Sequence, residues 1–225
     1  MDIILALTKE LNVEKWQIEA AVKLIDEGNT IPFISRYRKE VTGALNDEVL
    51  RNLNDRLTYL RNLEEKKTQV LSSIEEQGKL TEELKKQILE AQTLVVVEDL
   101  YRPYRPKRRT RATIAKEKGL EPLANIILLQ MTDKSLEEEA KAFVSEEKEV
   151  ATVEAAISGA KDIVAESISD KADYRSEIRE RTFRKGMLVS TAKKPEETSV
   201  YEKYYEYEER VEKMPGHRVL AINRG

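Results

Sequence analysis

The residues best suited to chemistry in this sequence form a basic run within RPYRPKRRTRATIAKEKG, residues 102–119. Eight lysines and arginines and one glutamate give residues 102–118, the basic segment, a local charge of +7. The whole chain has a net charge of −3, so the remainder carries −10. Each basic side chain that meets a nucleic-acid phosphate releases a counterion, which favours binding without reading the bases. The pattern therefore indicates weak, phosphate-directed binding of RNA or DNA. The candidate residues are Arg102, Arg105, Lys107, Arg108, Arg109, Arg111, Lys116 and Lys118.

The same basic side chains have a second interpretation, because the chain also contains 42 acidic residues. Cations that pair with these acids would fix the segment between two helical units. The sequence leaves both interpretations open, since one cluster can be partly paired and partly exposed.

Two smaller clusters are interpreted as structural. In RYRKE, Arg36 precedes Lys39 and Glu40 by three and four residues, and this spacing on a helix favours an intramolecular ion pair. Tyrosines at positions 201, 204, 205 and 207 could stack on bases, but the glutamates among them would repel phosphate. We expect these tyrosines to form an aromatic ridge that packs against another helix or domain.

The sequence offers little for catalysis. It has no cysteine and one histidine, His217, which excludes thiolate chemistry, cysteine zinc sites and two-histidine metal sites. Glu98 and Asp99 are adjacent, so their carboxylates point apart on a helix, and no glycine-rich phosphate loop is present. The many acids leave a metal-assisted nuclease as the weaker alternative. We expect a non-enzymatic protein without a cofactor.

A cytoplasmic location is expected. No apolar run approaches the roughly 20 residues that a membrane span needs, and the first residues lack the features of a signal peptide. The absence of cysteine fits a reducing compartment. We therefore expect no membrane contact.

The elements that would position the basic segment are helices. Charged residues make up 36% of the chain, which has only eight glycines. Leucines at positions 50, 53, 57, 60 and 63 predict a helix of about 32 residues, from about Asn46 to Gly78, that spans roughly 48 Å. Charges at 64–69 interrupt its apolar seam, so we expect it to pack against two parts of its own protein. The predicted class is all-α, multi-helical, with one long central helix.

A helix-turn-helix-like unit is predicted around the basic segment. Pro103 and Pro106 hold the chain extended, a short helix then stops at Gly119, and Pro122 opens a second helix. The apolar content of PLANIILLQM indicates a packing helix, because no base-reading face is evident. MLVSTA, 187–192, is the one segment that could be a strand. The expected divisions are 1–78 with the long helix, 79–145 with the helix-turn-helix-like unit, and 146–225 with helices that return to the long helix.

Four segments are distinctive when they are taken together: IPFISRYRKEVTGALN (31–46), VVEDLYRPYRPKRRTRATIAKEKGLEPLA (96–124), VEAAISGAKDIVAE (153–166) and PGHRVLAINRG (215–225). They resemble the N-terminal region of the Tex family, the bacterial transcription accessory proteins. The resemblance covers essentially the whole chain in order. It implies a helical region of a nucleic-acid-binding, transcription-associated protein.

The resemblance also implies domains that this sequence does not contain, namely RNase-H-like, helix-hairpin-helix and OB-fold domains. We therefore expect an expressed fragment whose helices contact those domains, with the transcription machinery as a further partner. The leading hypothesis is a nucleic-acid-binding transcription accessory factor. The alternative is a structural and protein-interaction scaffold that braces the missing domains.

Overall fold

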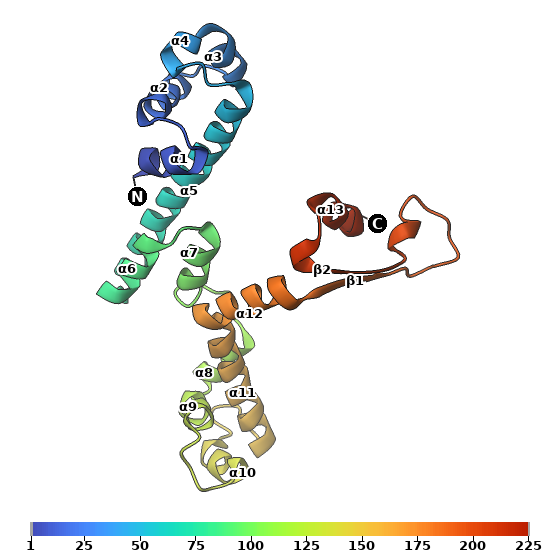
Figure 1. Ribbon diagram of the computed structural model, residues 1–225. Coiled ribbons are helices and arrows are strands. Elements are labelled where there is room, and N and C mark those ends of the chain that lie inside the picture. The colour runs from blue at the N-terminus through green and yellow to red at the C-terminus, as the bar shows by residue number, and fades with distance from the viewer. Residues whose placement is uncertain (1, 225) are drawn as a thin grey trace. The chain divides into compact units, whose positions relative to one another are not determined.

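The computed structural model describes residues 2–224, which are mostly helical, as predicted (Figure 1). They divide into two compact units, Met1–Tyr104 and Arg105–Gly225. The three-part division at residues 78 and 145 stays a prediction.

The first unit contains α1 (Ile3–Leu11), α2 (Lys15–Asp26), α3 (Ile31–Tyr37), α4 (Lys39–Thr42), α5 (Asp47–Glu76), α6 (Glu82–Glu90) and α7 (Leu94–Tyr101). The second contains α8 (Arg111–Glu117), α9 (Glu121–Leu129), α10 (Leu136–Ala140), α11 (Val153–Asp170), α12 (Ala172–Lys185), β1 (Met187–Thr191), β2 (Glu206–Arg210) and α13 (Gly216–Arg224), with three short 3-10 helices at Lys141–Phe143, Glu202–Tyr204 and Val211–Lys213.

The first unit is built around α5, which confirms the predicted long helix. The Asn46 side chain caps it by accepting a hydrogen bond from the Val49 amide at 2.8 Å, and Asp47 and Glu48 occupy the first turn, where the helix dipole favours acids. Its leucines form a buried stripe that contacts α1, α2 and α3 and, nearer its C-terminus, α6 and α7. The helix therefore packs against two parts of its own unit.

A buried lysine lies where charge interrupts the apolar seam of α5. The Lys67 side chain is only 2% exposed, and its ammonium group donates to Glu64 Oε1 at 2.8 Å and to the Leu89 carbonyl at 2.9 Å. Leu89 belongs to α6, so this polar contact joins α6 to the long helix. A buried ammonium group needs such partners, because an unpaired charge is costly to remove from water.

Two arginines on α5 bind carboxylates of the N-terminal helices. Arg56 binds both oxygens of Glu10 on α1, and Arg61 binds both oxygens of Asp26 on α2 at 2.7 and 2.8 Å. The hydrogen bonds from Arg61 hold the pKa of the Asp26 carboxyl below its usual range. These bidentate pairs fix the position of α1 and α2 along α5.

The single helix assumed for RYRKE is wrong, because the chain breaks at Arg38 (φ −131°) into α3 and α4. The Gln17 side chain on α2 donates to the carbonyls of Thr42 (3.2 Å) and Gly43 (3.1 Å), so the end of α4 is joined to α2. Asn12 ends α1 in a left-handed conformation (φ 52°).

The break at Arg38 also overturns the expected ion pair within RYRKE. Arg36 lies on α3, whereas Lys39 and Glu40 lie on α4. Within residues 2–224, none of these three side chains forms an ion pair. The cations at this position are therefore available to a partner.

The second unit has its own core, in which α8 and α9 pack on α11. Its hairpin confirms that MLVSTA holds a strand: β1 pairs antiparallel with β2, with Val189 opposite Glu208. The partner strand lies in the tyrosine-rich segment, for which no strand was expected. Among residues 2–224, no helix is both long enough and apolar enough to cross a lipid bilayer.

The tyrosines of this segment pack on one another and on α13. Tyr204 is buried and meets Tyr207 edge to face, with ring centroids 5.3 Å apart. Arg218 on α13 donates to the Tyr207 hydroxyl and to the Glu209 carboxylate, at 3.3 and 2.8 Å. Hydrogen bonds from Tyr207 and Arg218 hold the pKa of Glu209 below its usual range. The predicted structural role of the tyrosines holds for Tyr204 and Tyr207.

Replacing the buried lysine tests the polar contact between α5 and α6. We expect Lys67→Ala to lower the free energy of unfolding by about 3 kcal/mol, because Glu64 and the Leu89 carbonyl lose their partner in a partly buried site. The control is Lys86→Ala on α6, an exposed lysine, which should change stability by less than about 0.5 kcal/mol. Urea unfolding followed by circular dichroism measures both. Equal effects of the two substitutions would contradict the structural role of Lys67.

Candidate nucleic-acid interface

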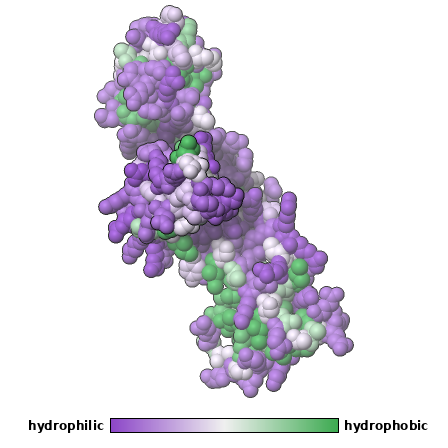
Figure 2. Space-filling model, turned by 90° about the vertical axis from the view of Figure 1, so that its right-hand side faces the viewer, coloured by the Kyte–Doolittle hydropathy of each residue, from purple (hydrophilic) through white to green (hydrophobic). Residues whose placement is uncertain are grey.

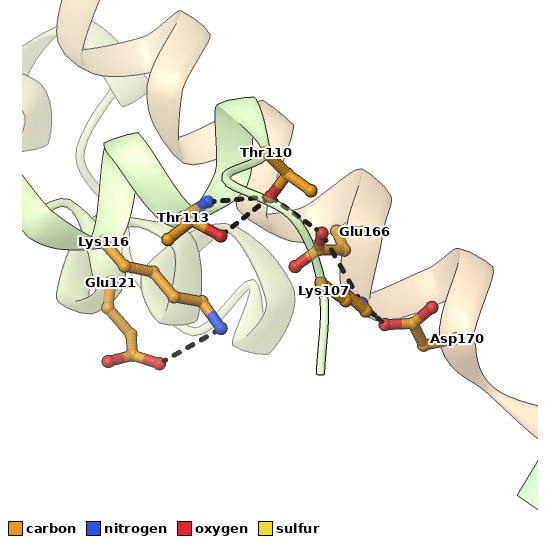
Figure 3. Close-up of polar contacts among 7 residues, drawn as sticks. All are labelled: Lys107, Thr110, Thr113, Lys116, Glu121, Glu166 and Asp170. Atoms are coloured by element: carbon orange, nitrogen blue, oxygen red, sulfur yellow. Dashed lines mark hydrogen bonds and ion pairs between the residues drawn. The ribbon is translucent and has the colours of Figure 1, made fainter. Parts of the chain in front are cut away.

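The second unit holds residues 105–118 of the basic segment, which run as an extended stretch into α8. Thr110 caps α8, because its hydroxyl oxygen accepts a hydrogen bond from the Thr113 amide at 3.0 Å. The same hydroxyl donates to Glu166 on α11 at 3.0 Å (Figure 3). The start of α8 is thereby tied to the helix on which it packs.

Lys107 anchors the extended stretch to the end of α11. Its ammonium group donates to the Asp170 carboxylate and lies 3.5 Å from Glu166 (Figure 3). These contacts make Lys107 the most firmly held of the candidate residues, because it has two carboxylate partners. The hypothesis of internal pairing therefore fits this residue best.

Four more candidates have one acidic partner each, but their pairs lie at the surface. The Arg109 and Arg111 side chains are 69% and 86% exposed. Exposed pairs contribute about 0–1 kcal/mol, so a phosphate can replace the carboxylate at little cost. The pairs are Arg109 with Glu117 (2.8 Å), Arg111 with Asp162 (3.8 Å), Lys116 with Glu121 (3.9 Å, Figure 3) and Lys118 with Glu149 (3.5 Å).

Two arginines of the extended stretch are unpaired. Arg105 and Arg108 are exposed, and neither forms an ion pair with any residue of the described range 2–224. They flank Lys107, so their backbone is held by the contacts of that residue with α11. Arg102 stands apart from this group, because it lies at the C-cap of α7 in the first unit, exposed but not without a partner.

The acids that hold the basic segment form a row on α11, which we call the acidic row: Asp162, Glu166 and Asp170. Their spacing of four residues places them on one face of the helix. Sequence reasoning did not identify this row, whose last member, Asp170, is also the last residue of α11. The regular spacing was visible in the sequence, but its partner was not.

The predicted helix-turn-helix-like arrangement is present in α8 and α9. Gly119 turns the chain between them with φ +78°, and Leu120, Leu123 and Ala124 bury the inner face of α9. The outer face exposes Leu128 and Leu129, which offer no hydrogen bonds to base edges. Figure 2 shows hydrophobic side chains at the surface in its lower part, where the helices from α8 to α11 lie. The arrangement fits a packing unit better than a base-reading one.

The adjacent acids Glu98 and Asp99 lie in different surroundings. Glu98 pairs with Lys66 at 2.7 Å, whereas Asp99 is buried, so the two carboxylates do point apart. No three His, Cys, Asp or Glu side chains within residues 2–224 gather where they could hold a metal ion. The second unit is thus a helical unit with an anchored basic surface.

Two family models match the chain. Residues 1–75 match the Tex-like protein N-terminal domain, and residues 132–225 match the Tex central region-like family. The chain belongs to the Tex family, of which it contains N-terminal and central regions. The resemblance seen in the four sequence segments is confirmed.

Relatives extend the match along the whole chain. Protein YdcI of Bacillus subtilis is 48% identical over 97% of this chain, and the transcriptional accessory protein Tex of Neisseria gonorrhoeae is 42% identical over 100% of it. The human S1 RNA-binding domain-containing protein 1 is 29% identical over 100% of the chain. The chain spans 31%, 30% and 23% of these three relatives, respectively.

The free energy of unfolding distinguishes the anchoring role of Lys107 from the role of the unpaired arginines. We expect Lys107→Ala to lower the free energy of unfolding by about 1–2 kcal/mol, because two carboxylates on α11 lose a charged hydrogen-bond partner. The double change Arg105→Ala, Arg108→Ala should cost less than about 0.5 kcal/mol. Urea unfolding compares them. A larger loss from the arginine pair would mean that these side chains are structural.

A glycine on α11 allows the close approach of the α8–α9 turn. A Cβ at Gly159 would come within 2.5 Å of Leu120 Cδ1, so Gly159→Ala should destabilise the second unit by about 1–3 kcal/mol although alanine favours helix. The control is Gly216→Ala at the start of α13, where a Cβ would meet nothing within 4 Å. Thermal unfolding checks both. A stabilised Gly159→Ala variant would refute the close packing.

Proposed function

We propose that this chain is a non-enzymatic, nucleic-acid-binding part of a transcription accessory protein, and that Arg105 and Arg108 make its first phosphate contacts. The observation that carries the proposal is that both arginines are exposed and unpaired on a stretch held at Lys107 and Thr110. A stretch that is already ordered loses little conformational freedom when it binds. The names of the Neisseria and human relatives, a transcriptional accessory protein and an S1 RNA-binding domain-containing protein, agree with it.

The remaining candidates contribute in a graded way. Arg109, Arg111, Lys116 and Lys118 exchange weak surface carboxylates for phosphates, so they extend the contact once the two arginines are bound. Lys107 positions the stretch, and Arg102 is a separate candidate in the first unit. Binding is weak and tolerant of base sequence, because the rest of the chain carries −10 and the contacts are to phosphate.

A second candidate function is a protein-interaction scaffold. It is favoured by the number of cations that pair internally and by the exposed Leu128, Leu129 and Met131 at and just beyond the end of α9. The relatives are about three times as long as this chain, so further domains and the transcription machinery are the proposed partners of such a surface.

Binding across a salt series tests the first function. We expect Arg105→Ser with Arg108→Ser to weaken binding of a labelled 20-nucleotide RNA and to make the slope of log K against log salt shallower by about 1.4 for two lost phosphate contacts. The matched control is Arg181→Ser with Arg184→Ser on α12, which removes the same charge from the same unit. Fluorescence anisotropy measures affinity, and circular dichroism checks folding.

The outcomes of this experiment separate the two functions. Equal losses from the two double variants would mean that net charge alone drives binding, and the assignment to Arg105 and Arg108 would fail. No binding of RNA or DNA by the unmodified chain, even at low salt, would leave the scaffold as the supported function.

A further inference from the structure

We propose that the first unit has a second nucleic-acid surface at the α3–α4 corner, defined as Phe33, Arg36, Tyr37, Arg38 and Lys39, and that this surface holds a single strand. Bases stack on Tyr37, and phosphates meet Arg36 and Lys39. The inference does not rest on the basic segment, because the corner belongs to a different compact unit and has its own contacts.

An exposed aromatic ring is fixed at this corner. Tyr37 is 60% exposed, and its ring centroid lies 5.4 Å from that of Phe33. The Arg38 guanidinium lies 5.0 Å over the Phe33 ring and donates to the Tyr37 carbonyl at 3.0 Å. Phe33 and Arg38 therefore contact Tyr37, while much of the tyrosine faces solvent. Such rings bind single strands, because every base has a flat face to stack.

Two cations close to Tyr37 in the sequence, Arg36 and Lys39, have no ion-pair partner among residues 2–224. Both residues are exposed. Glu40 is the one acid in residues 31–46, which also contain two arginines and a lysine and so carry a local +2. Figure 2 shows hydrophobic and hydrophilic side chains side by side at the top of the view, where α3 and α4 lie. Charge and aromatic surface therefore occur together.

A natural reporter lies next to the corner. Trp16, the single tryptophan of the chain, is 52% exposed and packs on Gly43, since a Cβ there would come 2.5 Å from the ring. Gly43 ends the single turn that begins at Lys39, a rise of about 6 Å along the helix. A strand that crosses the corner would alter the fluorescence of Trp16.

The partner that fits these features is single-stranded nucleic acid. Bases in a duplex are stacked on each other and present no free face to Tyr37, whereas a single strand can place a base on the ring and its phosphates on Arg36 and Lys39. A polypeptide partner would need acids for the cations and an apolar side chain for the ring. An absence of oligo(U) quenching in the test would favour such a partner over single-stranded nucleic acid.

The test is a titration of Trp16 fluorescence with 12-nucleotide oligo(U), in the chain carrying Arg105→Ser and Arg108→Ser so that the basic segment contributes little. We expect quenching that saturates, and a much smaller response to a 12-base-pair duplex. Tyr37→Ala should weaken oligo(U) binding by about fivefold to a hundredfold, and Tyr37→Phe should keep it, because the ring remains. Since Tyr37 is exposed, the variants should keep their helical circular dichroism.

Removing the cations gives the second arm. Arg36→Ser with Lys39→Ser should weaken binding and make the salt slope shallower by about 1.4. The control, Lys85→Ser with Lys86→Ser on α6, removes equal charge from the same unit and should leave binding nearly unchanged. The proposal is overturned by an absence of quenching, by equal affinity for the duplex, or by unchanged binding in both Tyr37→Ala and the cation variant. The result does not depend on the proposed role of Arg105 and Arg108, because both arginines are already replaced in the chain under test.

Discussion

The acidic row on α11 is the constraint on which the basic surface of the second unit depends. Eight cations in seventeen residues would repel one another if nothing opposed them. Glu166 and Asp170 bind Lys107, and Asp162 lies 3.8 Å from Arg111, so the segment is ordered and partly neutralised along one helix. Because folding already orders the segment, less conformational entropy would be lost on binding, which would favour the proposed association with phosphate.

The first unit also uses polar contacts to join helices to its long helix. Lys67 on α5 is buried and donates to a carboxylate of its own helix and to a carbonyl of α6. Arg56 and Arg61 on α5 bind carboxylates on α1 and α2 at the surface of the unit. Apolar packing along the stripe of α5 is not directional, whereas hydrogen bonds between charged groups have a preferred geometry. In both units, ion pairs therefore connect neighbouring elements to a long helix.

Sequence reasoning succeeded where the cause is local. The stripe of α5 and the turn at Gly119 follow from spacing and residue type within a few positions. It failed where contacts between distant residues matter: the break at Arg38 lies in a segment whose end is bound by Gln17, and β2 pairs with β1. The same holds for the candidate site. Its charges could be predicted from the sequence, but their ion pairs depend on the packing of α11 and could not.

The pairing also explains how an acidic protein can carry a basic surface. A carboxylate at a solvent-exposed arginine is a weak competitor for phosphate, because surface ion pairs contribute little and are screened by salt. The proposed binding would therefore replace the acids that face Arg109 and Arg111 at little cost. Buried or doubly held cations such as Lys67 and Lys107 cannot exchange partners so easily. Burial and the number of carboxylate partners, more than charge, thus separate the cations that position the fold from those that can meet a ligand.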